Sequence, residues 1–482
     1  MEDKAIRGVP WTFLAYAVNK GIRIVSLMVL ARLLAPSDFG IVALALASLA
    51  FVNVFSDLGL GAVLVVRQDL DRRSMGTVLS MMLITGTAGA VIVAGTAPLV
   101  ASLLDEDELT PFLVVLSLTL MINVFAWFYE MLMQRELEFR RLFACNVAQT
   151  VAYVVVTLSL AISGAGAWSL VAGEIAGSLA LGVALLVATP YRVAPAWARH
   201  RVRELFGAGW GFLAQGGVSF IEGNADRLII GRLLGTTQLG FYSIAFRLGE
   251  MPYWALAHPV AMVTFPGFSR MRERGEEITA AFLSSLRFVA VLVVPVGVLL
   301  SATAGPVVHT LLGEQWIPAI DIIAIMGLWA AVHSLAGILA WLLNSIGEAK
   351  LLAKASATMI LALVPGIAVA ASLGGVREVA SVVLASAVVN VAIYALCIQR
   401  RGGIVLREQW RAVRAPVLAA PGAWLIAAAL IRLGEGWPAG ATLAIALLAG
   451  LAADAIVLVA LDRSIVTWIP AQVRRALAPG PA

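Results

Sequence analysis

Cysteine and charge are both scarce in this sequence. Cys145 and Cys397 are the only cysteines, and they supply neither a disulfide framework nor a zinc ligand set. Charged residues make up 13% of the 482 residues, about half the usual share of a soluble domain, whereas 61% are hydrophobic. No Walker-type lysine motif is present, so we do not expect ATP hydrolysis by this chain. The composition predicts a membrane protein that needs neither a metal nor another cofactor.

Long apolar runs recur along the whole chain. Each run is about 20 residues or longer, which is enough for a helix to cross a hydrocarbon core of about 30 Å. No stretch between them is long enough to form a soluble domain, so we expect an all-α integral membrane protein. The fourteen predicted spans are 10–34, 39–66, 77–104, 110–133, 143–163, 168–189, 208–233, 239–265, 282–312, 319–345, 351–373, 378–398, 415–431 and 440–461.

Lysine and arginine are unevenly distributed between the connections. Most of the 34 basic residues lie in alternate connections and at the two chain ends, and basic loops stay on the cytoplasmic side. We therefore expect both termini to be cytoplasmic. The formal charge of +5 then reflects attraction to anionic lipid, and nucleic acid is not an expected partner. The acidic run DEDE at 105–108 falls in an outer connection, where a solvated loop is expected.

A short repeat appears at an offset of 200 residues. ARLLAPSDFG at 31–40 aligns with GRLLGTTQLG at 231–240, so that Arg32 matches Arg232 and Gly40 matches Gly240. Both arginines lie near outer helix ends, where they are expected to snorkel to the interface. Each segment joins the first and second helix of a six-helix block, and blocks with an even number of helices form parallel repeats. The sequence predicts two six-helix lobes around a central cavity: an N-lobe at 1–189 (helices 1–6), a cytoplasmic linker at 190–207, a C-lobe at 208–400 (helices 7–12), and two further helices with a cytoplasmic tail at 401–482.

Six stretches share a pattern of glycine and arginine set in apolar sequence. They are LARLLAPSDFGIVALA (30–45), DLGLGAVLV (57–65), MQRELEFRRL (133–142), GAGAWSLVAGEI (164–175), NADRLIIGRLLGTTQLGFYSIA (224–245) and FPGFSRM (265–271). In this order, they resemble the polysaccharide flippases, the Wzx-type branch of the multidrug/oligosaccharidyl-lipid/polysaccharide exporter superfamily. The resemblance covers most of the chain up to about residue 400.

The resemblance implies a transporter of the bacterial inner membrane, not an enzyme. It implies two lobes around a cavity that opens alternately to each side. The implied cargo is a polyprenyl-pyrophosphate-linked oligosaccharide for surface polysaccharide synthesis. The implied partners are this lipid-linked glycan, membrane lipid and other polysaccharide assembly proteins.

Two basic residues interrupt the first apolar run near its middle. A charge at the bilayer centre costs about 2.5–3.5 kcal/mol, so Lys20 and Arg23 are expected to face the protein interior, with Asn19 on the same helix face. Asp57 lies at a matching depth, and an ion pair between Lys20 and Asp57 is one interpretation. It leaves Arg23 without a partner. We favour a water-filled cavity in which Arg23 and Lys20 attract the pyrophosphate, because a guanidinium donates two parallel hydrogen bonds to phosphate oxygens.

A second polar group lies on the predicted seventh and eighth helices. Glu222 and Asp226 are four residues apart and share a face. Asp226 and Arg247 lie at similar depths, which is compatible with an ion pair or with contacts to substrate. Glu222 and Glu250 are candidates for ion coupling, because a partly buried carboxylate can exchange protons near neutral pH. The residues assigned to this part of the cavity are Glu222, Asn224, Asp226, Arg227, Arg247 and Glu250.

Prolines mark a candidate hinge in the eighth helix. Pro252, Pro259 and Pro266 recur every seven residues, and each removes a backbone hydrogen bond and favours a kink. His258, His309 and His333 stand singly in different spans. We expect them to be packed or to line a cavity, and not to bind metal.

Three classes of function are compatible with this architecture. They are a flippase for lipid-linked oligosaccharides, an ion-coupled exporter of drugs or small molecules with the same two-lobe fold, and an intramembrane enzyme of polysaccharide assembly. A cation exporter would place carboxylates at the centre of its first helix, where this chain has Lys20 and Arg23. An enzyme of this kind would need a larger outer loop than the sequence provides. The flippase is therefore the function that we predict.

Overall fold

The computed structural model describes residues 19, 21–57, 60, 61, 64, 71–136, 138–434 and 436–465. Within these residues the secondary structure is helical and contains no β-strand. Eleven helices in this part of the chain are long and apolar enough to cross a membrane. The predicted all-α membrane class is confirmed.

The first half of the chain forms long helices joined by short turns. The side chain of Asp71 caps the helix that begins at Arg72, because it accepts a hydrogen bond from the backbone N–H of Ser74 at 3.0 Å. Asp105, with φ of 58°, ends the same helix. The helices of this half are 21–33, α2 (Pro36–Asp57), α4 (Arg72–Leu104), α5 (Leu109–Arg135), α6 (Phe139–Ile162), α7 (Ala167–Ala188) and α8 (Arg199–Pro252).

The second half begins with a π-helical turn and continues as helices. Its elements are η1 (Tyr253–Ala257), α9 (His258–Glu273), α10 (Thr279–Ala302), α11 (Ala304–Val307), η2 (Val308–Leu312), η3 (Glu314–Ala319), α12 (Ile320–Ser345), α13 (Ala349–Leu373), α14 (Val376–Gly402), α15 (Leu406–Leu433) and α16 (Ala439–Leu461). The predicted spans 319–345 to 440–461 each match one of the helices α12 to α16.

Three of the fourteen predicted spans are not among the eleven membrane-length apolar helices. These are 10–34, 208–233 and 239–265, which correspond to the helical residues 21–33, to the first part of α8, and to the end of α8 with η1 and α9. The predicted number of fourteen spans therefore stays a prediction.

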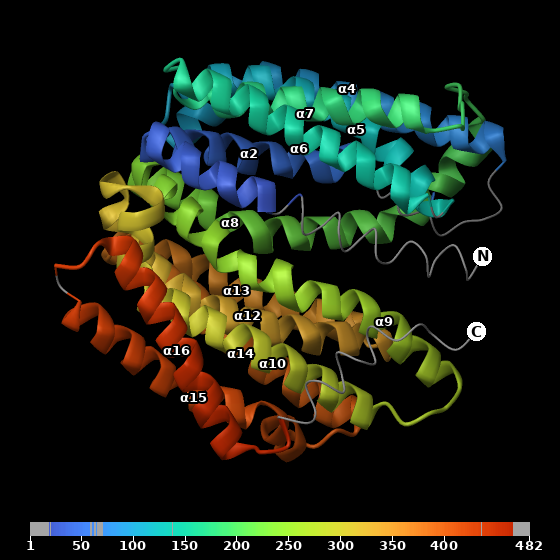
Figure 1. The fold of residues 1–482 in the computed structure, drawn as a ribbon. Coiled ribbons are helices and arrows are strands. Elements are labelled where there is room, and N and C mark those ends of the chain that lie inside the picture. The colour runs from blue at the N-terminus through green and yellow to red at the C-terminus, as the bar shows by residue number, and fades with distance from the viewer. Residues whose placement is uncertain are drawn as a thin grey trace. The chain divides into compact units, whose positions relative to one another are not determined.

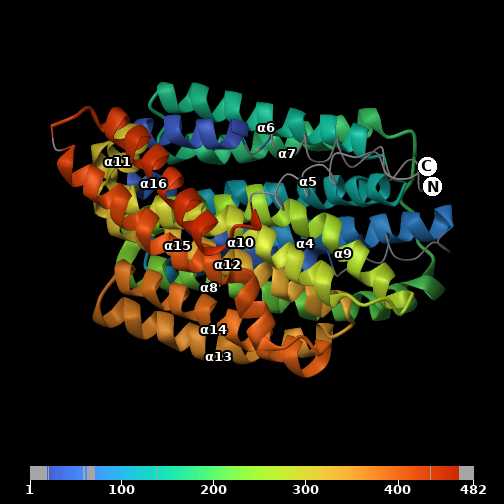
Figure 2. The ribbon, with the colours of Figure 1, turned by 60° about the horizontal axis from the view of Figure 1, so that its bottom comes forward.

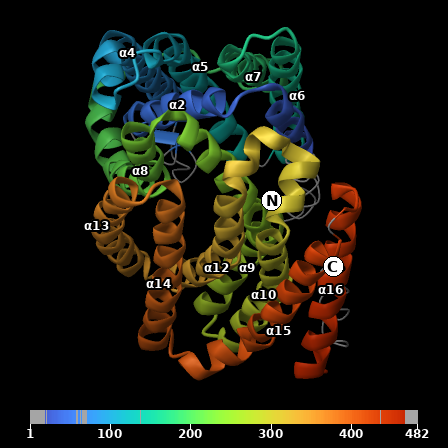
Figure 3. The same cartoon turned by 90° about the vertical axis from the view of Figure 1, so that its left-hand side faces the viewer.

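The chain forms two compact units, Met1–Ser243 and Ile244–Ala482. In the first unit α4 packs on α5, and α7 packs on both α5 and α6 (Figures 1 and 3). In the second unit α12 packs on α10 and α14, while α15 lies beside α16 and α10 (Figure 2). Buried side chains such as Phe128 in the first unit and Phe282 in the second form the cores. The lobe bounds taken from the sequence repeat stay a prediction.

The two glycines matched by the repeat lie in direct contact inside the first unit. A Cβ atom on Gly40 would lie 1.7 Å from the carbonyl oxygen of Thr236, and one on Gly240 would lie 1.9 Å from the carbonyl oxygen of Pro36. Pro36 and Thr236 are themselves 200 positions apart, so the contact is reciprocal, as it is across a two-fold axis. Here α2 and α8 approach so closely that only glycine fits.

Helix α8 contains a break next to this contact. Gly235 has φ of 83° and ψ of 170°, a conformation outside the helical region that glycine adopts without strain. The break separates residues 199–234 from 236–252, close to the connection expected between the spans 208–233 and 239–265. Glycine therefore allows the chain to turn without a loop.

Candidate functional site

Arg23 lies against an aromatic ring of a neighbouring helix. Its guanidinium carbon is 5.5 Å from the centre of the Tyr153 ring on α6, within the range of a cation–π interaction. The Tyr153 side chain is 9% exposed, whereas that of Arg23 is exposed. The Tyr153 ring therefore stabilises the positive charge of Arg23, which is still accessible from outside the packed core.

Asn19 contributes an amide one turn before Arg23. Its side-chain oxygen is buried and has no hydrogen-bond partner among the described residues. Residues four apart lie on one helix face, so the Asn19 amide and the Arg23 guanidinium face the same direction. Lys20 lies outside the described residues, and for Asp57 only the backbone at the end of α2 is described. The predicted Lys20–Asp57 ion pair is thus not tested.

The residues predicted on the seventh helix all lie in the first part of α8. The buried carboxylate of Asp226 accepts hydrogen bonds from the phenol of Tyr242 at 2.5 Å and from the backbone N–H of Arg227 at 2.8 Å. The guanidinium of Arg227 donates to the side-chain oxygen of Asn224 at 3.4 Å. The side chain of Glu222 is exposed. Asp226 is held inside the protein, whereas Glu222, Asn224 and Arg227 remain at least partly accessible.

Arg247 and Glu250 belong to the second compact unit. Both lie in the last turns of α8, and the side chain of Arg247 is exposed while that of Glu250 is half-buried. The spacing of three residues places them on one face of the helix.

The proline-rich segment departs from α-helical geometry between its first two prolines. Residues 253–257 form a π-helical turn, in which the N–H of His258 donates to the carbonyl of Tyr253, five residues earlier. Pro259 has no N–H for the carbonyl of Ala255, so a regular α-helical hydrogen bond is missing at this point. Pro266 lies within α9, which is continuous from His258 to Glu273. The proline spacing thus accompanies a local change of helix type, and its role as a hinge stays a prediction.

The acidic connection at 105–108 is more than a solvated loop. The carboxylate of Asp105 accepts a hydrogen bond from the guanidinium of Arg232 at 3.1 Å, although both side chains are largely exposed. The side chain of Glu106 is hydrogen-bonded to that of Thr236. Arg232, for which the sequence predicted snorkelling, is therefore paired with this loop next to the break in α8.

The environment of Glu106 predicts a pH-dependent stability. Burial raises the pKa of its carboxyl above 4.5, as do the neighbouring charges of Glu108, Asp107 and Asp105, while the Thr236 hydrogen bond lowers it. A raised folded-state pKa means that the folded protein holds this proton more tightly. The contribution of the protonated Glu106 carboxyl to folding stability is therefore complete below about pH 4.5, and it is lost as the pH rises through the pKa of the folded protein.

We expect Glu106→Gln to raise the melting temperature slightly at pH 7 and to have no effect at pH 4, measured by thermal unfolding in detergent. A stabilisation of equal size at both pH values would contradict this.

Asp38 is a structural residue that the sequence reasoning missed. Its carboxylate accepts hydrogen bonds from the backbone N–H of Ala35 at 2.9 Å and from that of Ala167, at the start of α7, at 3.0 Å. It thereby ties the repeat segment to the connection between α6 and α7. A pocket of about 280 Å³ lies beside this contact, and its walls include Glu108, Trp168 and Thr236. An aspartate within the repeat was the available sequence signal.

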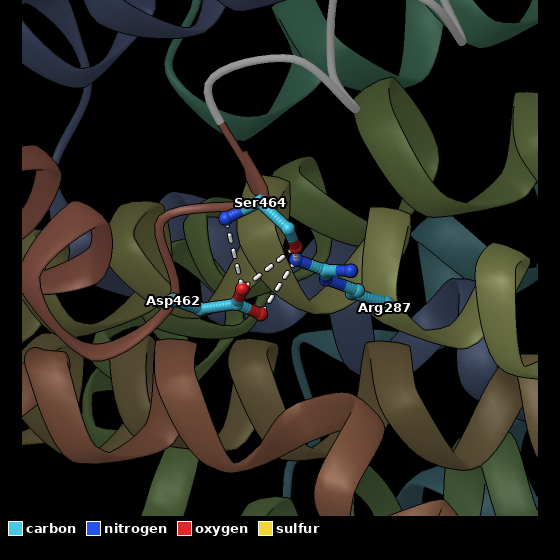
Figure 4. A network of polar contacts seen from close by, with 3 residues as sticks. All are labelled: Arg287, Asp462 and Ser464. Carbon is cyan, nitrogen blue, oxygen red and sulfur yellow. Dashed lines mark hydrogen bonds and ion pairs between the residues drawn. The ribbon is translucent and has the colours of Figure 1, made fainter.

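A separate polar network fastens the end of α16 to α10 in the second unit. The guanidinium of Arg287 donates to Asp462 at 2.5 Å and to the hydroxyl of Ser464 at 2.7 Å, and Ser464 in turn donates to Asp462 (Figure 4). Because Arg287 is engaged by a carboxylate, this network neutralises its own charge. We assign it a structural role in holding α16 on α10.

The fold defines a multi-pass membrane protein. Charged side chains are few along its apolar helices, and the guanidinium of Arg23 is exposed and not enclosed in the core. Residues 29–321 match the family described as polysaccharide biosynthesis protein. The chain belongs to this family.

Relatives and solved structures agree with this assignment. The succinoglycan biosynthesis transport protein ExoT of Rhizobium meliloti is 27% identical over 322 residues, which cover 67% of this chain and 65% of that protein. The chain thus spans slightly less than two thirds of this relative's length. The lipopolysaccharide biosynthesis protein WzxC of Escherichia coli is 24% identical over 341 residues, 69% of this chain and 68% of the relative.

Two solved structures share the fold. The lipid II flippase MurJ in an inward closed conformation has a TM-score of 0.78 at 12% identity, with 96% of this chain and 100% of that chain covered. An inward-facing multidrug resistance transporter of the MATE family, in the MOP superfamily, has a TM-score of 0.64 at 14% identity, with 81% and 96% covered. These two likenesses concern the fold, and the family that the sequence motifs resembled, that of the polysaccharide biosynthesis proteins, is confirmed by the match over residues 29–321.

Proposed function

We propose that this protein is a flippase of the bacterial inner membrane that moves polyprenyl-pyrophosphate-linked oligosaccharides outward by alternating access. Family membership supports the proposal, as do relatives named for succinoglycan, lipopolysaccharide and teichuronic acid biosynthesis. In this proposal both termini are cytoplasmic, and the lobes at 1–189 and 208–400 open alternately to the two sides. Other polysaccharide assembly proteins are proposed partners.

The observation that carries the proposal is the position of Arg23 over Tyr153. To bind a pyrophosphate, a cation must give up water and still keep its position. The Tyr153 ring keeps the Arg23 guanidinium in place. Two parallel N–H groups then bind phosphate oxygens, and the Asn19 amide adds a further polar contact. Lys20 and Asp57 are assigned to the same site from the sequence, together with the polar residues of α8. Coupling of transport to a driving ion is assigned to Glu222 and Glu250.

Transport of a defined lipid tests the proposal. The protein is reconstituted in vesicles with a fluorescent polyprenyl-pyrophosphate oligosaccharide, and movement between leaflets is followed by a membrane-impermeant quencher. We expect movement faster than in empty vesicles, and a proton gradient should change its rate if Glu222 and Glu250 couple transport to protons. Movement of a fluorescent cationic drug without movement of the lipid would instead support an exporter with the same fold.

A further inference from the structure

A group of aromatic rings lies where the π-helical turn meets α12. We call this group, formed by Tyr253, Trp254, His258, His333 and Trp341, the aromatic wall. Tyr253 is its centre, with ring centres 5.2 Å from Trp254, 6.0 Å from His258 and 5.2 Å from His333. All five side chains are half-buried, so none is part of a fully closed core.

The local backbone explains why these rings meet. In a π-helical turn, residues five apart share a face, which brings the ring of Tyr253 beside that of His258. On α12, the residues His333, Gly337 and Trp341 follow each other at intervals of four and lie on one face. A Cβ atom on Gly337 would lie 2.7 Å from the ring of Tyr253, so the glycine makes the space for this ring. Both helices thus contribute to one surface.

The indole N–H of Trp341 points into the aromatic wall. Tryptophan near a helix end commonly anchors a protein by directing its N–H to lipid headgroups or water. Here the indole N–H is directed at the phenol oxygen of Tyr253 instead. The rings of His258 and Phe265 meet it steeply, at interplanar angles of 74° and 66° and centre distances of 6.3 and 5.3 Å. Trp341 is thus fixed in orientation and meets these two neighbours edge to face.

The polar character of the same helix face argues against lipid tails as the occupant. Arg247, Glu250 and Trp254 follow one another at intervals of three and four residues, so the wall continues a charged face of α8. Ionisable side chains at membrane depth face protein or water and not hydrocarbon. A flat indole beside an imidazole suits a ligand with one apolar face and a rim of hydroxyl groups, which describes a pyranose ring. Its C–H bonds carry partial positive charge and pack on the negative face of the indole.

We propose that Trp341 is a stacking platform for a sugar ring of the lipid-linked oligosaccharide. Tyr253 positions the indole, and His258 lies at its edge, within reach of sugar hydroxyls. The inference rests on the flippase function proposed above. It adds detail to that function, because it assigns recognition of the saccharide to Trp341 and attraction of the pyrophosphate to Arg23.

The test compares two lipids on the full chain in nanodiscs. One is the lipid-linked oligosaccharide extracted from the native host, and the other is polyprenyl pyrophosphate without sugar. We expect Trp341→Leu to weaken binding of the glycosylated lipid about tenfold, as for the loss of one aromatic stacking contact, and to leave binding of the sugar-free lipid unchanged. Trp341→Phe, which keeps a ring, should retain most of the affinity. Tyr253→Phe should cause an intermediate loss, since it removes only the acceptor that orients Trp341.

The controls separate this inference from the proposed function. Trp424→Leu makes the same substitution at an exposed position of α15 and should change neither affinity. Equal weakening for both lipids, or no weakening for either, in Trp341→Leu would overturn the stacking platform. If the wild type binds and moves the glycosylated lipid in that case, the flippase function stands without it. A wild type that binds neither lipid would instead remove the proposed function.

Discussion

Replacing Gly240 with alanine is expected to prevent α2 and α8 from packing and to abolish transport. The new Cβ atom would lie 1.9 Å from the carbonyl oxygen of Pro36, which is a backbone atom that cannot turn aside as a side chain can. The helices must separate, and contacts along them are then lost, such as the edge-on packing of Phe51 against Phe220. We expect a destabilisation of about 3 kcal/mol or more, at the upper end for overpacked sites. Gly40→Ala should act alike, because its Cβ atom would lie 1.7 Å from the oxygen of Thr236.

Thermal unfolding in detergent and the transport assay measure this effect together. Gly217→Ala on the same helix is the matched control, since a Cβ atom there has no neighbour within 4 Å. It should unfold as the wild type does, or slightly higher, because alanine favours the helix. A Gly240→Ala protein with the melting temperature and transport rate of the wild type would show that the close approach of the two helices is not required.

The helices of this fold were largely predictable, whereas their contacts were not. Apolar length alone located most membrane helices, because a span must satisfy its backbone internally and bury no charge. The repeat matched Gly40 with Gly240, but nothing in one sequence indicates that two equivalent residues touch each other. That contact depends on how two helices cross, which is set by packing along their whole length.

The candidate site shows the same division between local and long-range information. Arg23 stood out because a charge in an apolar run is costly, and this cost is a property of the local sequence. Tyr153 did not stand out, since an aromatic residue in an apolar helix is equally compatible with facing lipid. The π-helical turn was also missed, although Pro259, which directly follows His258, was identified. A proline predicts the loss of a hydrogen bond and does not specify which helix type replaces it.

Arg23→Ala is expected to lower the rate of lipid-linked oligosaccharide transport by about 10- to 100-fold, corresponding to the loss of a charge-assisted hydrogen-bonded contact of about 1.5–3 kcal/mol. The reason is that alanine removes the guanidinium that lies over Tyr153 and leaves the rest of the helix unchanged. Arg23→Lys should be intermediate, because an ammonium keeps the charge but cannot donate two parallel hydrogen bonds to a phosphate. The vesicle transport assay measures all three proteins.

The comparison with a second arginine decides whether the effect is local. Arg432 lies exposed near the end of α15, so Arg432→Ala removes the same charge from the protein without touching the proposed site. We expect it to transport at the rate of the wild type. Tyr153→Leu should fall between the wild type and Arg23→Ala, since it removes only the ring that steadies the guanidinium, and a cation–π contact contributes about 0.5–2 kcal/mol. If Arg23→Ala and Arg432→Ala transport equally well, the positive charge of Arg23 does not attract the cargo, and the pyrophosphate must be bound elsewhere.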